Sequence, residues 1–589
     1  MEIVNSLKRK VGKPILSFFE KNIYTWAFFI LLVISVASVI WLLYMQVVRP
    51  TNMVSSVPNH VIKTLIDAMI LMSPLFVLKK RGLIFIVLVL VDLFCLSAVW
   101  YYRNYLDIIP FSSFLLVENV SPLLLDSALA SARWVDWLAL LPTVLTAVVY
   151  KLFLQKRVLA ERKRLWWPIA AIVGIAVAFY AMLSVRDIKS GQYTAFIDRF
   201  MTYPNNILYI DNNGLCGYTL YQLVTGLIPE PELSDEERAK IDSFFDDYTC
   251  YTDNLIQGNN RKNLVLIIVE SLNSWVIGQQ FGGVEVTPCL NRIANDSNSI
   301  VAVHVFPQVK DGRSSDGQFM FNTGLLPLQS GAVATRYANL DYYSIAKALK
   351  QRNYTAVSMT VDCNNYWNQA EASEAYGYDH NWDRLNGAEV VPDSLLMVRA
   401  IEQIKTEKVP FFYQLITGSS HKPYNTPTRP TALSNAEGFP TEVRNYMEVM
   451  HYTDRCIGAF IDSLRVNGLY ENTVIAIASD HNQLLEPCSV PGYNDIEVAF
   501  IVANAGLKYT HKSVMGQIDI YPTLLDVMGC NEYLWKGLGH SILRSSVCSA
   551  VGWNKAVYGT PDDSLVPQQI EAWDISRQMI TRGYFTIKR

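Results

Sequence analysis

The stretch that decides the fold runs from Asn263 to Trp275 and reads N-L-V-L-I-I-V-E-S-L-N-S-W. The part before Glu270 is almost entirely apolar and largely β-branched, which predicts a strand buried on both faces of a parallel sheet. Ligands of open α/β sheets bind at the carboxyl ends of the strands, where this pattern places Glu270. Taken alone, Glu270 is more simply explained as a helix cap or as one half of an ion pair.

Two other strand-like runs end in polar groups of the same kind. Asp480 and His481 directly follow T-V-I-A-I-A-S (473–479), and His421 comes shortly after F-F-Y-Q-L-I (411–416). A lone Asp-His pair or a lone histidine is ordinary, but Glu, Asp and neutral His at the strand ends of one sheet suit Zn²⁺ or Mn²⁺. The sequence therefore predicts one divalent ion, with Mg²⁺ as a further option. His421 would bind a phosphate or protonate a leaving oxygen.

A candidate nucleophile lies in D-G-R-S-S-D-G, from Asp311 to Gly317. A hydroxyl in a glycine-flanked turn beside a basic residue is what a metal-activated nucleophile requires, because coordination lowers the pKa of the hydroxyl. By itself, the segment would be explained better as an ordinary polar turn. Its interest comes from the predicted metal ligands elsewhere in the same domain.

The rest of the carboxyl-terminal half alternates strand-like and helix-like patterns, as βαβ units do. We expect one large α/β domain with a mostly parallel central sheet. Further strands are predicted at 354–361 and 498–502, and helices at 343–351, 393–405, 441–466 and 519–528. The final 578–588 segment, with Gly583 near its middle, predicts a hairpin.

The amino-terminal third predicts a membrane domain. Of the 589 residues, 51% are hydrophobic and only 17% are charged, and the apolar excess lies before about Val185. Segments long enough to cross a bilayer run over 24–45, 61–78, 83–102, 135–154 and 166–185, and the second is the weakest because it contains Lys63 and Asp67. The net charge of −3 argues against a nucleic-acid-binding protein.

Basic residues give the orientation of this domain. Lys and Arg gather before the first segment and in the second-to-third and fourth-to-fifth loops, which places these parts in the cytoplasm. Five crossings would then put everything after Val185 outside, as expected for a multi-pass protein of the cell (inner) membrane with an extracytoplasmic or periplasmic catalytic domain. We expect a five-helix transmembrane domain at 1–187, an extracytoplasmic connector at 188–260 and the catalytic domain at 261–589.

These motifs, in this order, resemble those of the lipoteichoic acid synthase branch of the alkaline-phosphatase/sulfatase superfamily. V-E-S-L-N-S-W resembles the L-E-S block of that family, G-R-S-S-D resembles G-K-T-S-D, S-S-H-K-P-Y resembles S-N-H-x-P-F, and S-D-H-N resembles G-D-H. The segment Q-I-D-I-Y-P-T-L-L-D, from Gln517 to Asp526, is close to a carboxyl-terminal block seen across the superfamily. The resemblance covers nearly the whole chain.

By position, the resemblance implies a metal held by four residues, with Ser314 as the nucleophile and His421 touching the substrate. The implied metal ligands are Glu270, Ser314, Asp480 and His481. It also implies a head-group pocket from V-D-C-N-N-Y-W-N-Q, in which Asp362 and Trp367 match the family pattern. Gln369 stands where the family has an arginine, and the loss of a fixed cation puts phosphoglycerol specificity in doubt.

The activity implied is that of a membrane-anchored, phosphoglycerol-type transferase. A membrane phospholipid would donate its head group to Ser314, and a glycan or lipid acceptor would then receive it. Phosphoethanolamine transfer, phosphodiester hydrolysis and a non-catalytic envelope protein remain as alternatives. The C/S-x-P-x-R motif that generates formylglycine is missing, because Tyr493 stands where Ser489-Val490-Pro491 would need an arginine. This argues against a formylglycine sulfatase.

Overall fold

The computed structural model forms two compact units that divide between Pro229 and Glu230. This boundary falls inside the predicted connector, and the three-part division of the chain stays a prediction. The residues that the structure describes are 22–49, 56–105, 108, 131–161, 165–189, 200, 206–227, 230–248, 255–256, 262–329, 331–363, 366–383, 391–425, 431–483, 485, 492–494, 496–530, 533, 537–560 and 563–587.

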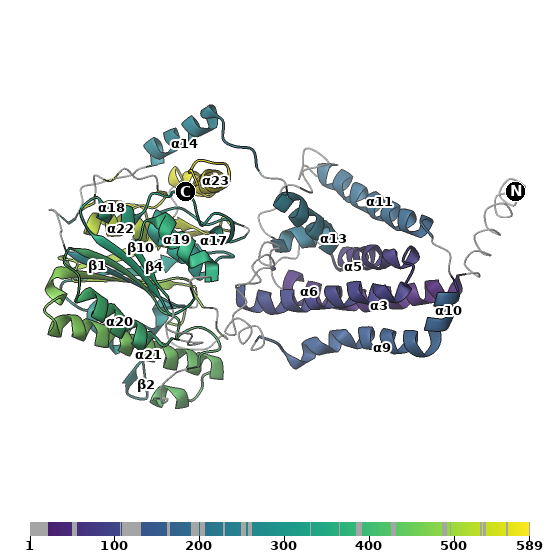
Figure 1. Ribbon diagram of the computed structural model, residues 1–589, viewed down its shortest axis with the longest axis horizontal. Helices are drawn as coiled ribbons and strands as arrows, with labels where there is room; N and C mark the ends of the chain where they lie inside the picture. The colour runs from purple at the N-terminus through teal and green to yellow at the C-terminus, as the bar shows by residue number, and fades with distance from the viewer. Residues whose placement is uncertain are drawn as a thin grey trace, which may run out of the picture. The chain divides into compact units, whose positions relative to one another are not determined.

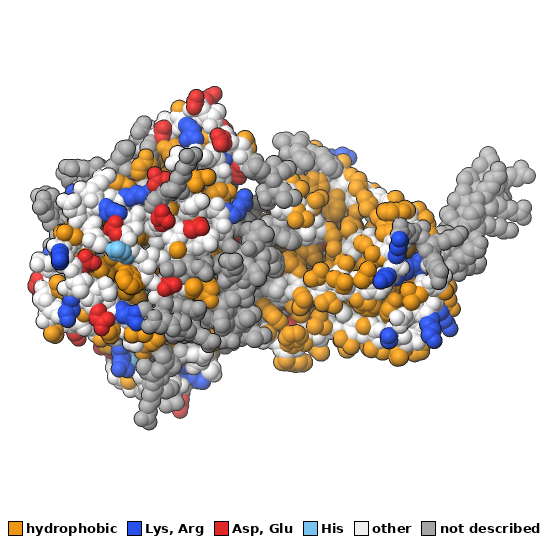
Figure 2. All heavy atoms as spheres, viewed as in Figure 1, with side chains coloured by type: hydrophobic (Ala, Val, Ile, Leu, Met, Phe, Trp, Pro, Cys, Tyr) orange, Lys and Arg blue, Asp and Glu red, His pale blue; other side chains and the backbone are white. Residues whose placement is uncertain are grey.

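The first unit consists of apolar helices (Figure 1). They are α3 (Ile23–Leu43), which continues as a π-helical turn to Val48, α5 (Val57–Met72), α6 (Ile84–Tyr105), α9 (Leu141–Val149) with its flanking turns, α10 (Gln155–Ala160), α11 (Trp167–Lys189) and α13 (Asn206–Leu227). Hydrophobic side chains cover most of the face of this unit seen in Figure 2. Such a surface fits lipid better than water.

Four helices of the described residues are long and apolar enough to cross a membrane. They run over Ile23–Val48, Arg81–Arg103, Trp134–Ala160 and Trp167–Lys189. The second predicted span is also helical, as α5, but it is only 16 residues long and carries buried Lys63 and Asp67. The number of crossings, and with it the side of the membrane that the second unit faces, therefore depends on α5 and stays a prediction.

The second unit is built on an eight-stranded sheet with the strand order β10-β4-β9-β8-β1-β7-β5-β6. Its strands are β1 (Asn263–Val269), β4 (Ile300–Phe306), β5 (Thr355–Thr360), β6 (His380–Trp382), β7 (Phe411–Ile416), β8 (Thr473–Ser479), β9 (Val498–Ala503) and β10 (Tyr509–Gly516). Only β9 runs antiparallel to its neighbours in this sheet. The mostly parallel sheet expected from the sequence is confirmed.

Side chains of β1 alternate between two hydrophobic cores, as a strand buried on both faces requires. Leu264, Leu266 and Ile268 pack in one core, and Val265 and Ile267 pack in the other. The first core is covered by α16 (Ser314–Thr323), α18 (Ile345–Lys350), α19 (Gln369–Tyr376), α22 (Ile520–Val527) and α23 (Leu565–Thr581), and the second by α15 (Pro288–Ala294), α20 (Asp393–Ile404) and α21 (Thr441–Val466) (Figure 1). The domain is thus a helix–sheet–helix sandwich.

The predicted hairpin at the carboxyl terminus is wrong. Residues up to Thr581 belong to α23, whose buried Trp573, Ser576 and Ile580 recur at helical spacing. Gly583 then turns the chain with φ of 76°, and Ile587 forms an isolated bridge to Leu340. The remaining elements are α14 (Asp235–Tyr248), α17 (Val333–Arg336) and two small hairpins, β2–β3 (Gln280–Phe281, Val284–Glu285) and β11–β12 (Ser549–Val551, Val557–Gly559).

Candidate metal centre and nucleophile

The sheet register brings the polar groups that follow three strands to one edge. Strand β1 lies between β8 and β7, with Val269 paired to Ser479 and Ile268 paired to Ile416. Glu270 and Asp480, one residue further along, therefore lie at the same level, and Thr417 lies level with Val269. The backbone ladder continues into this edge, because the Asp480 N–H donates to the Val269 carbonyl over 3.2 Å.

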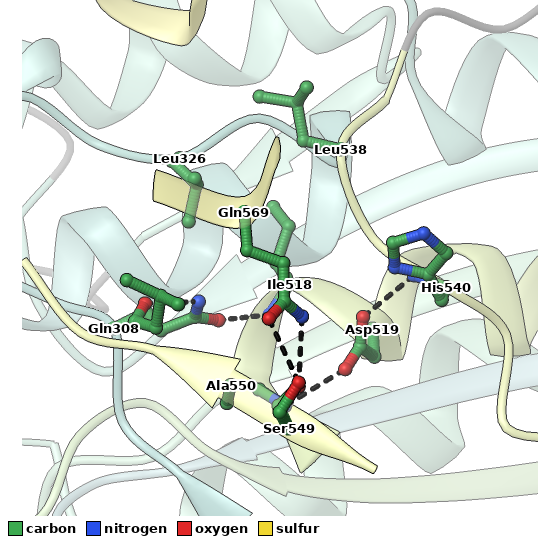
Figure 3. Close-up of a pocket in the computed structure, with 11 residues that line it drawn as sticks. Gln308, Leu326, Ile518, Asp519, Leu538, His540, Ser549, Ala550 and Gln569 are labelled. Atoms are coloured by element: carbon green, nitrogen blue, oxygen red, sulfur yellow. Dashed lines mark hydrogen bonds between the residues drawn. The ribbon is translucent and has the colours of Figure 1, made fainter. Parts of the chain in front are cut away.

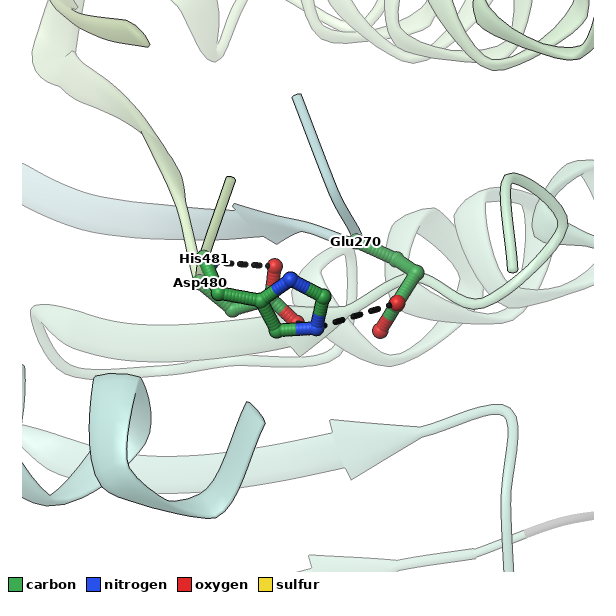
Figure 4. Close-up of side chains that lie close together, drawn as sticks. All are labelled: Glu270, Asp480 and His481. Carbon is green, nitrogen blue, oxygen red and sulfur yellow. Dashed lines mark hydrogen bonds and ion pairs between the residues drawn. The ribbon is translucent and has the colours of Figure 1, made fainter. Parts of the chain in front are cut away.

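Glu270, Asp480 and His481 form a buried group whose ligand atoms all lie within 4.8 Å of one another (Figure 4). His481 Nε2 lies 3.3 Å from Glu270 Oε1 and 3.7 Å from Asp480 Oδ2. His481 Nδ1 lies 3.0 Å from the Asn482 carbonyl oxygen and 3.2 Å from Arg313 Nη2. In the tautomer that donates from Nδ1 to the carbonyl, Nε2 keeps a lone pair for a metal. Two carboxylates and an imidazole are a donor set that Zn²⁺ and Mn²⁺ both accept.

The electrostatics of this group also fit a cation. Burial raises the pKa of the Asp480 carboxyl to about 7, and the neighbouring Glu270 carboxylate adds to the rise. Burial acts on Glu270 in the same direction, but the charge and hydrogen bond of His481, together with the charge of His421, hold the pKa of Glu270 well below its usual range. Two buried carboxylates at this separation repel each other unless positive charge lies between them. A divalent ion would supply that charge.

Ser314 reaches the group from the first turn of α16. Its Oγ donates to Glu270 Oε2 over 3.1 Å. The preceding loop is fixed by Asp316, whose Oδ2 accepts the N–H groups of Lys310 (2.9 Å) and Gly312 (3.0 Å). Helix α16 lies directly against the end of β8, because a Cβ on Gly317 would be 2.5 Å from the Asp480 carbonyl oxygen. A glycine at this position allows the close approach.

The loop after β7 carries His421 and is tied to Glu270 on both sides. Thr417 Oγ1 accepts from the Glu270 N–H over 3.1 Å, and Ser420 Oγ donates to the Glu270 carbonyl over 2.6 Å. Asp393, at the start of α20, accepts from the N–H groups of Gly418 (3.0 Å) and Ser419 (3.1 Å). His421 is half-buried at this edge, and its charge acts on Glu270. The structure thus places His421 beside the predicted ligands.

Comparison with known families identifies this unit. Residues 262–530 match the model of the sulfatase family. The chain contains a sulfatase-family domain. Among curated proteins, it is 28% identical to lipoteichoic acid synthase 2 of Bacillus subtilis over 47% of this chain and 46% of that protein. It is 23% identical to the lipoteichoic acid synthase of Staphylococcus saprophyticus over 80% of this chain and 76% of that protein. The match to the Bacillus relative therefore spans about half of that protein's length.

A solved structure supports the fold of the sulfatase-family domain. The crystal structure of the lipoteichoic acid synthase LtaP from Listeria monocytogenes superposes with a TM-score of 0.52 at 19% identity. The match covers 60% of this chain and 99% of that one. The apolar helices of this chain precede the sulfatase-family domain in sequence. The expected order of a helical membrane part followed by an α/β domain is confirmed.

The predicted head-group residues follow β5, the strand next to β7 in the sheet of the sulfatase-family domain. Asp362 is exposed, and Trp367 is half-buried with φ of 53°. Asn368 also has a left-handed backbone, with φ of 48°. Consecutive residues of this kind are uncommon outside glycine and tend to occur at functional sites. Gln369 is buried, and its Nε2 donates to Ser373 Oγ over 3.3 Å, within α19 rather than toward Glu270.

Sequence reasoning missed two residues that support the site. Arg313, with φ of 43°, donates from Nη2 to the Asn482 carbonyl over 3.0 Å and so joins the nucleophile loop to the loop after β8. Gln517 is fully buried, and its Nε2 donates to the carbonyl oxygens of Ser479 (2.9 Å) and Asp480 (2.8 Å). In the sequence, the only indication of this role is that Gln517 begins the Q-I-D-I-Y-P-T block.

A small polar pocket is lined by residues that include Gln308, Ile518, Asp519 and His540 (Figure 3). Gln517 Oε1 accepts from the Gln308 N–H over 3.0 Å, and Gln308 Oε1 accepts from the Ile518 N–H over 3.0 Å. Asp519 Oδ1 accepts from the His540 N–H over 2.6 Å. Because these hydrogen bonds join the lining residues to one another and to Gln517, which binds the carbonyl groups of Ser479 and Asp480, we interpret the pocket as structural support for the end of β8.

Proposed function

We propose that the chain is a membrane-anchored, metal-dependent transferase. It would move a phosphoglycerol-type head group from a membrane phospholipid to a glycan or lipid acceptor. The observation that carries the proposal is the 3.1 Å contact between Ser314 Oγ and Glu270 Oε2, because Glu270 belongs to the buried group that also contains Asp480 and His481. The names of the relatives, lipoteichoic acid synthases, support the direction of the chemistry.

In the first half-reaction, Ser314 Oγ attacks the phosphorus of the lipid phosphodiester. The bond from Oγ to phosphorus forms, and the bond from phosphorus to the diacylglycerol oxygen breaks. Glu270 Oε2, which accepts the Ser314 hydrogen bond, orients the hydroxyl and takes its proton as the bond to phosphorus forms. His421, at the same edge of the sheet, delivers a proton to the leaving oxygen, and diacylglycerol departs. The phospho-alcohol stays on Ser314 as a covalent intermediate.

In the second half-reaction, a hydroxyl of the acceptor attacks the same phosphorus. The bond from phosphorus to Ser314 Oγ breaks, Oγ regains its proton from Glu270 Oε2, and His421 takes the proton of the acceptor hydroxyl. Glu270, Asp480, His481 and Ser314 would hold the divalent ion, Mn²⁺ or Zn²⁺. When bound, that ion lowers the pKa of a coordinated hydroxyl and stabilises negative charge on the phosphoryl oxygens.

Asp362, Trp367 and Gln369 are proposed to contact the head group. Gln369 is a neutral amide, and the described segment 366–369 contains no Lys or Arg. The pocket therefore supplies no cation of its own from this segment. Such a pocket accommodates the hydroxyls of glycerol, and it tolerates the ammonium of ethanolamine equally well. The identity of the transferred group is thus the first quantity to measure.

The decisive experiment is mass spectrometry of the full chain after incubation with phosphatidylglycerol or phosphatidylethanolamine vesicles and Mn²⁺. We expect one phosphoglycerol adduct on the peptide that contains Ser314. The Ser314→Ala variant should carry none, and a matched Ser463→Ala variant on α21 should carry the normal amount. A phosphoethanolamine adduct would show that the donor is phosphatidylethanolamine, and the proposed role of Ser314 would stand. Turnover of lipid by Ser314→Ala at the normal rate would refute the nucleophile.

We also propose that α5 completes the crossing. Five crossings place the sulfatase-family domain outside the cytoplasm, where the lipid donor and a cell-envelope acceptor meet. The Lys and Arg residues of the loops at 79–81 and 156–164 support this orientation. Protease digestion of intact spheroplasts should cleave the sulfatase-family domain. Complete protection, with cleavage only after lysis, would place it in the cytoplasm.

A further inference from the structure

Helix α13 is broken in the middle, at Gly214. Gly214 has φ of 75° and ψ of 176°, so the helix consists of two halves, one before and one after this residue. A side chain could not replace the hydrogen of Gly214, because a Cβ there would lie 2.6 Å from Tyr180 Oη and 2.7 Å from Asp67 Oδ2. Three helices, α5, α11 and α13, therefore meet at the break.

Polar side chains of the first unit bind the backbone groups that the break exposes. On the second half, the N–H groups of Leu215 and Cys216 donate to the Asp67 carboxylate over 2.7 and 3.1 Å. On the first half, Tyr44 Oη donates to the Ile210 carbonyl over 3.2 Å, and Lys63 Nζ donates to the Asp211 carbonyl. Buried polar groups of this kind are costly in apolar surroundings unless they are paired.

We call the contacts of Asp67, Tyr44 and Lys63 with α13 the clamp. It also includes one pair of side chains. His60 Nε2 lies 2.6 Å from Asp211 Oδ1, and both side chains are almost completely buried. Residue Asp211 is the only charged residue between Asn206 and Leu227 in the sequence. The only charged side chain of α13, Asp211, therefore points into the first unit and pairs with His60. The exposed face of the helix carries no charged side chain.

One face of α13 packs on the other helices of its unit, and the opposite face is apolar and uncovered. Ile210, Leu215 and Tyr218 are buried in the core of the first unit. By contrast, Leu220, Leu223 and Val224 are 64%, 47% and 45% exposed, at the spacing of a helical stripe. This stripe belongs to the compact unit that contains the four candidate spans, whose outer faces are also apolar.

We propose that the broken helix α13 lies in the membrane and that its exposed stripe contacts lipid acyl chains. The stripe is defined as Leu220, Leu223 and Val224. Its depth would be that of the leaflet occupied by the amino-terminal half of α5, because Lys63 and Asp67 hold α13 there. A broken helix is tolerated at such a depth when neighbouring side chains bind its freed backbone groups, and apolar residues are the ones that favour insertion there. The inference is independent of the proposed transferase activity.

Photo-crosslinking tests the occupant of the stripe directly. The full chain would carry benzoylphenylalanine in place of Leu223 and be reconstituted into vesicles of phosphatidylcholine and phosphatidylglycerol before irradiation. Control positions are Leu90 on α6, 60% exposed in a candidate span, and Val466 at the end of α21, 87% exposed in the sulfatase-family domain. Mass spectrometry would measure the fraction of each labelled peptide that carries a phospholipid.

We expect a phospholipid adduct at position 223 at a yield close to that of position 90. The yield should exceed that of position 466 on the order of tenfold, because lipid-facing side chains meet acyl chains continuously. A yield no higher than that of position 466 would overturn the proposal. Crosslinking of position 223 to a second copy of the chain, in place of lipid, would overturn it as well.

A second variant tests the clamp. Asp67→Ala removes the acceptor for the N–H groups of Leu215 and Cys216, so the second half of α13 should lose its fixed position. The phospholipid adduct at position 223 should then fall several-fold, while the adduct at position 90 stays unchanged. An unchanged yield at position 223 would show that Asp67 does not seat the helix.

Discussion

The two units place buried carboxylates in opposite situations. In the helical unit, Asp67 accepts two backbone N–H groups and Asp211 pairs with His60, so each acid has a partner supplied by the chain. In the sulfatase-family domain, Glu270 and Asp480 lie together at the strand ends around one histidine. The comparison teaches that burial of an acid does not by itself predict a ligand. Two buried acids that lie together around a single histidine, as Glu270 and Asp480 do around His481, do predict a bound cation.

The strongest test of this difference is to neutralise one acid in each unit and to measure metal binding. Glu270→Gln should remove the bound divalent ion and lower lipid turnover by about 10³-fold or more, because both the ligand and the Ser314 acceptor are lost. Asp67→Asn should leave the metal content unchanged. Metal analysis of the purified proteins, together with the turnover assay, measures both. Full metal content in Glu270→Gln would exclude the proposed centre.

Metal removal tests the same contrast without a mutation. Dialysis against a chelator should lower the unfolding temperature of the sulfatase-family domain, and Mn²⁺ or Zn²⁺ should restore it. An ion that binds only the folded state stabilises it by about 2.7 kcal/mol at one hundred times its dissociation constant. Calorimetry of the full chain in detergent would record the shift. Glu270→Gln serves as the control, and an equal shift in that variant would indicate binding elsewhere.

The next prediction separates the nucleophile, Ser314, from the other three proposed metal ligands. Gly317→Ala places a methyl group 2.5 Å from the Asp480 carbonyl oxygen, which forces α16 away from β8. Because Ser314 begins α16, we expect turnover to fall on the order of 10²-fold through misplacement of the hydroxyl. Three of the four proposed ligands, Glu270, Asp480 and His481, are not on this helix, so metal content should be largely kept.

The matched control is Gly458→Ala on α21, where the added methyl would meet Cys289 at ordinary contact distances of 3.4 and 3.5 Å. This variant should retain nearly normal turnover. If Gly317→Ala were as active as Gly458→Ala, the close approach of α16 to β8 would not be needed for the chemistry. Circular dichroism and the unfolding temperature would report whether either variant has lost its fold.

The smallest effect concerns Asp519, an acid of the sulfatase-family domain that resembles Asp67 in its partners. It accepts N–H groups from His540 (2.6 Å) and Gly516 (2.8 Å), yet burial raises its pKa to about 7. The folded chain then holds a proton that the unfolded chain releases near pH 4. Stability should therefore fall as pH rises from about 4 to about 7 and stay level above that.

Melting curves of the wild type and of Asp519→Asn over this pH range isolate the contribution. The difference in unfolding temperature between the two proteins should change with pH, because only the wild type has the titrating group. A constant difference across the range would mean that Asp519 keeps its ordinary pKa. In that case the two hydrogen bonds that Asp519 accepts would fully cancel the effect of burial on its pKa.

Much of the sulfatase-family domain could be predicted from local pattern. Strands β1, β7 and β8 have the limits that their apolar runs indicate, because a strand buried on both faces is made almost entirely of apolar residues. Strand β10 was missed, since its exposed residues Thr510, Lys512 and Ser513 interrupt the apolar positions and leave no continuous run. The end of the chain was misassigned because Gly583 looks like a hairpin turn, whereas the burial of Met579 and Ile580 is decided by packing.

The sequence by itself determined the order of the two units and the residue types at three strand ends, because hydrophobic periodicity and strand termini are local properties. Only the tertiary structure decided that Glu270, Asp480 and His481 converge, since that follows from β1 lying between β7 and β8. It likewise decided where Ser314 points and how α13 breaks at Gly214. These features depend on which surfaces approach one another, and Gly317 and Asp67 acquire their roles from neighbours far away in the chain.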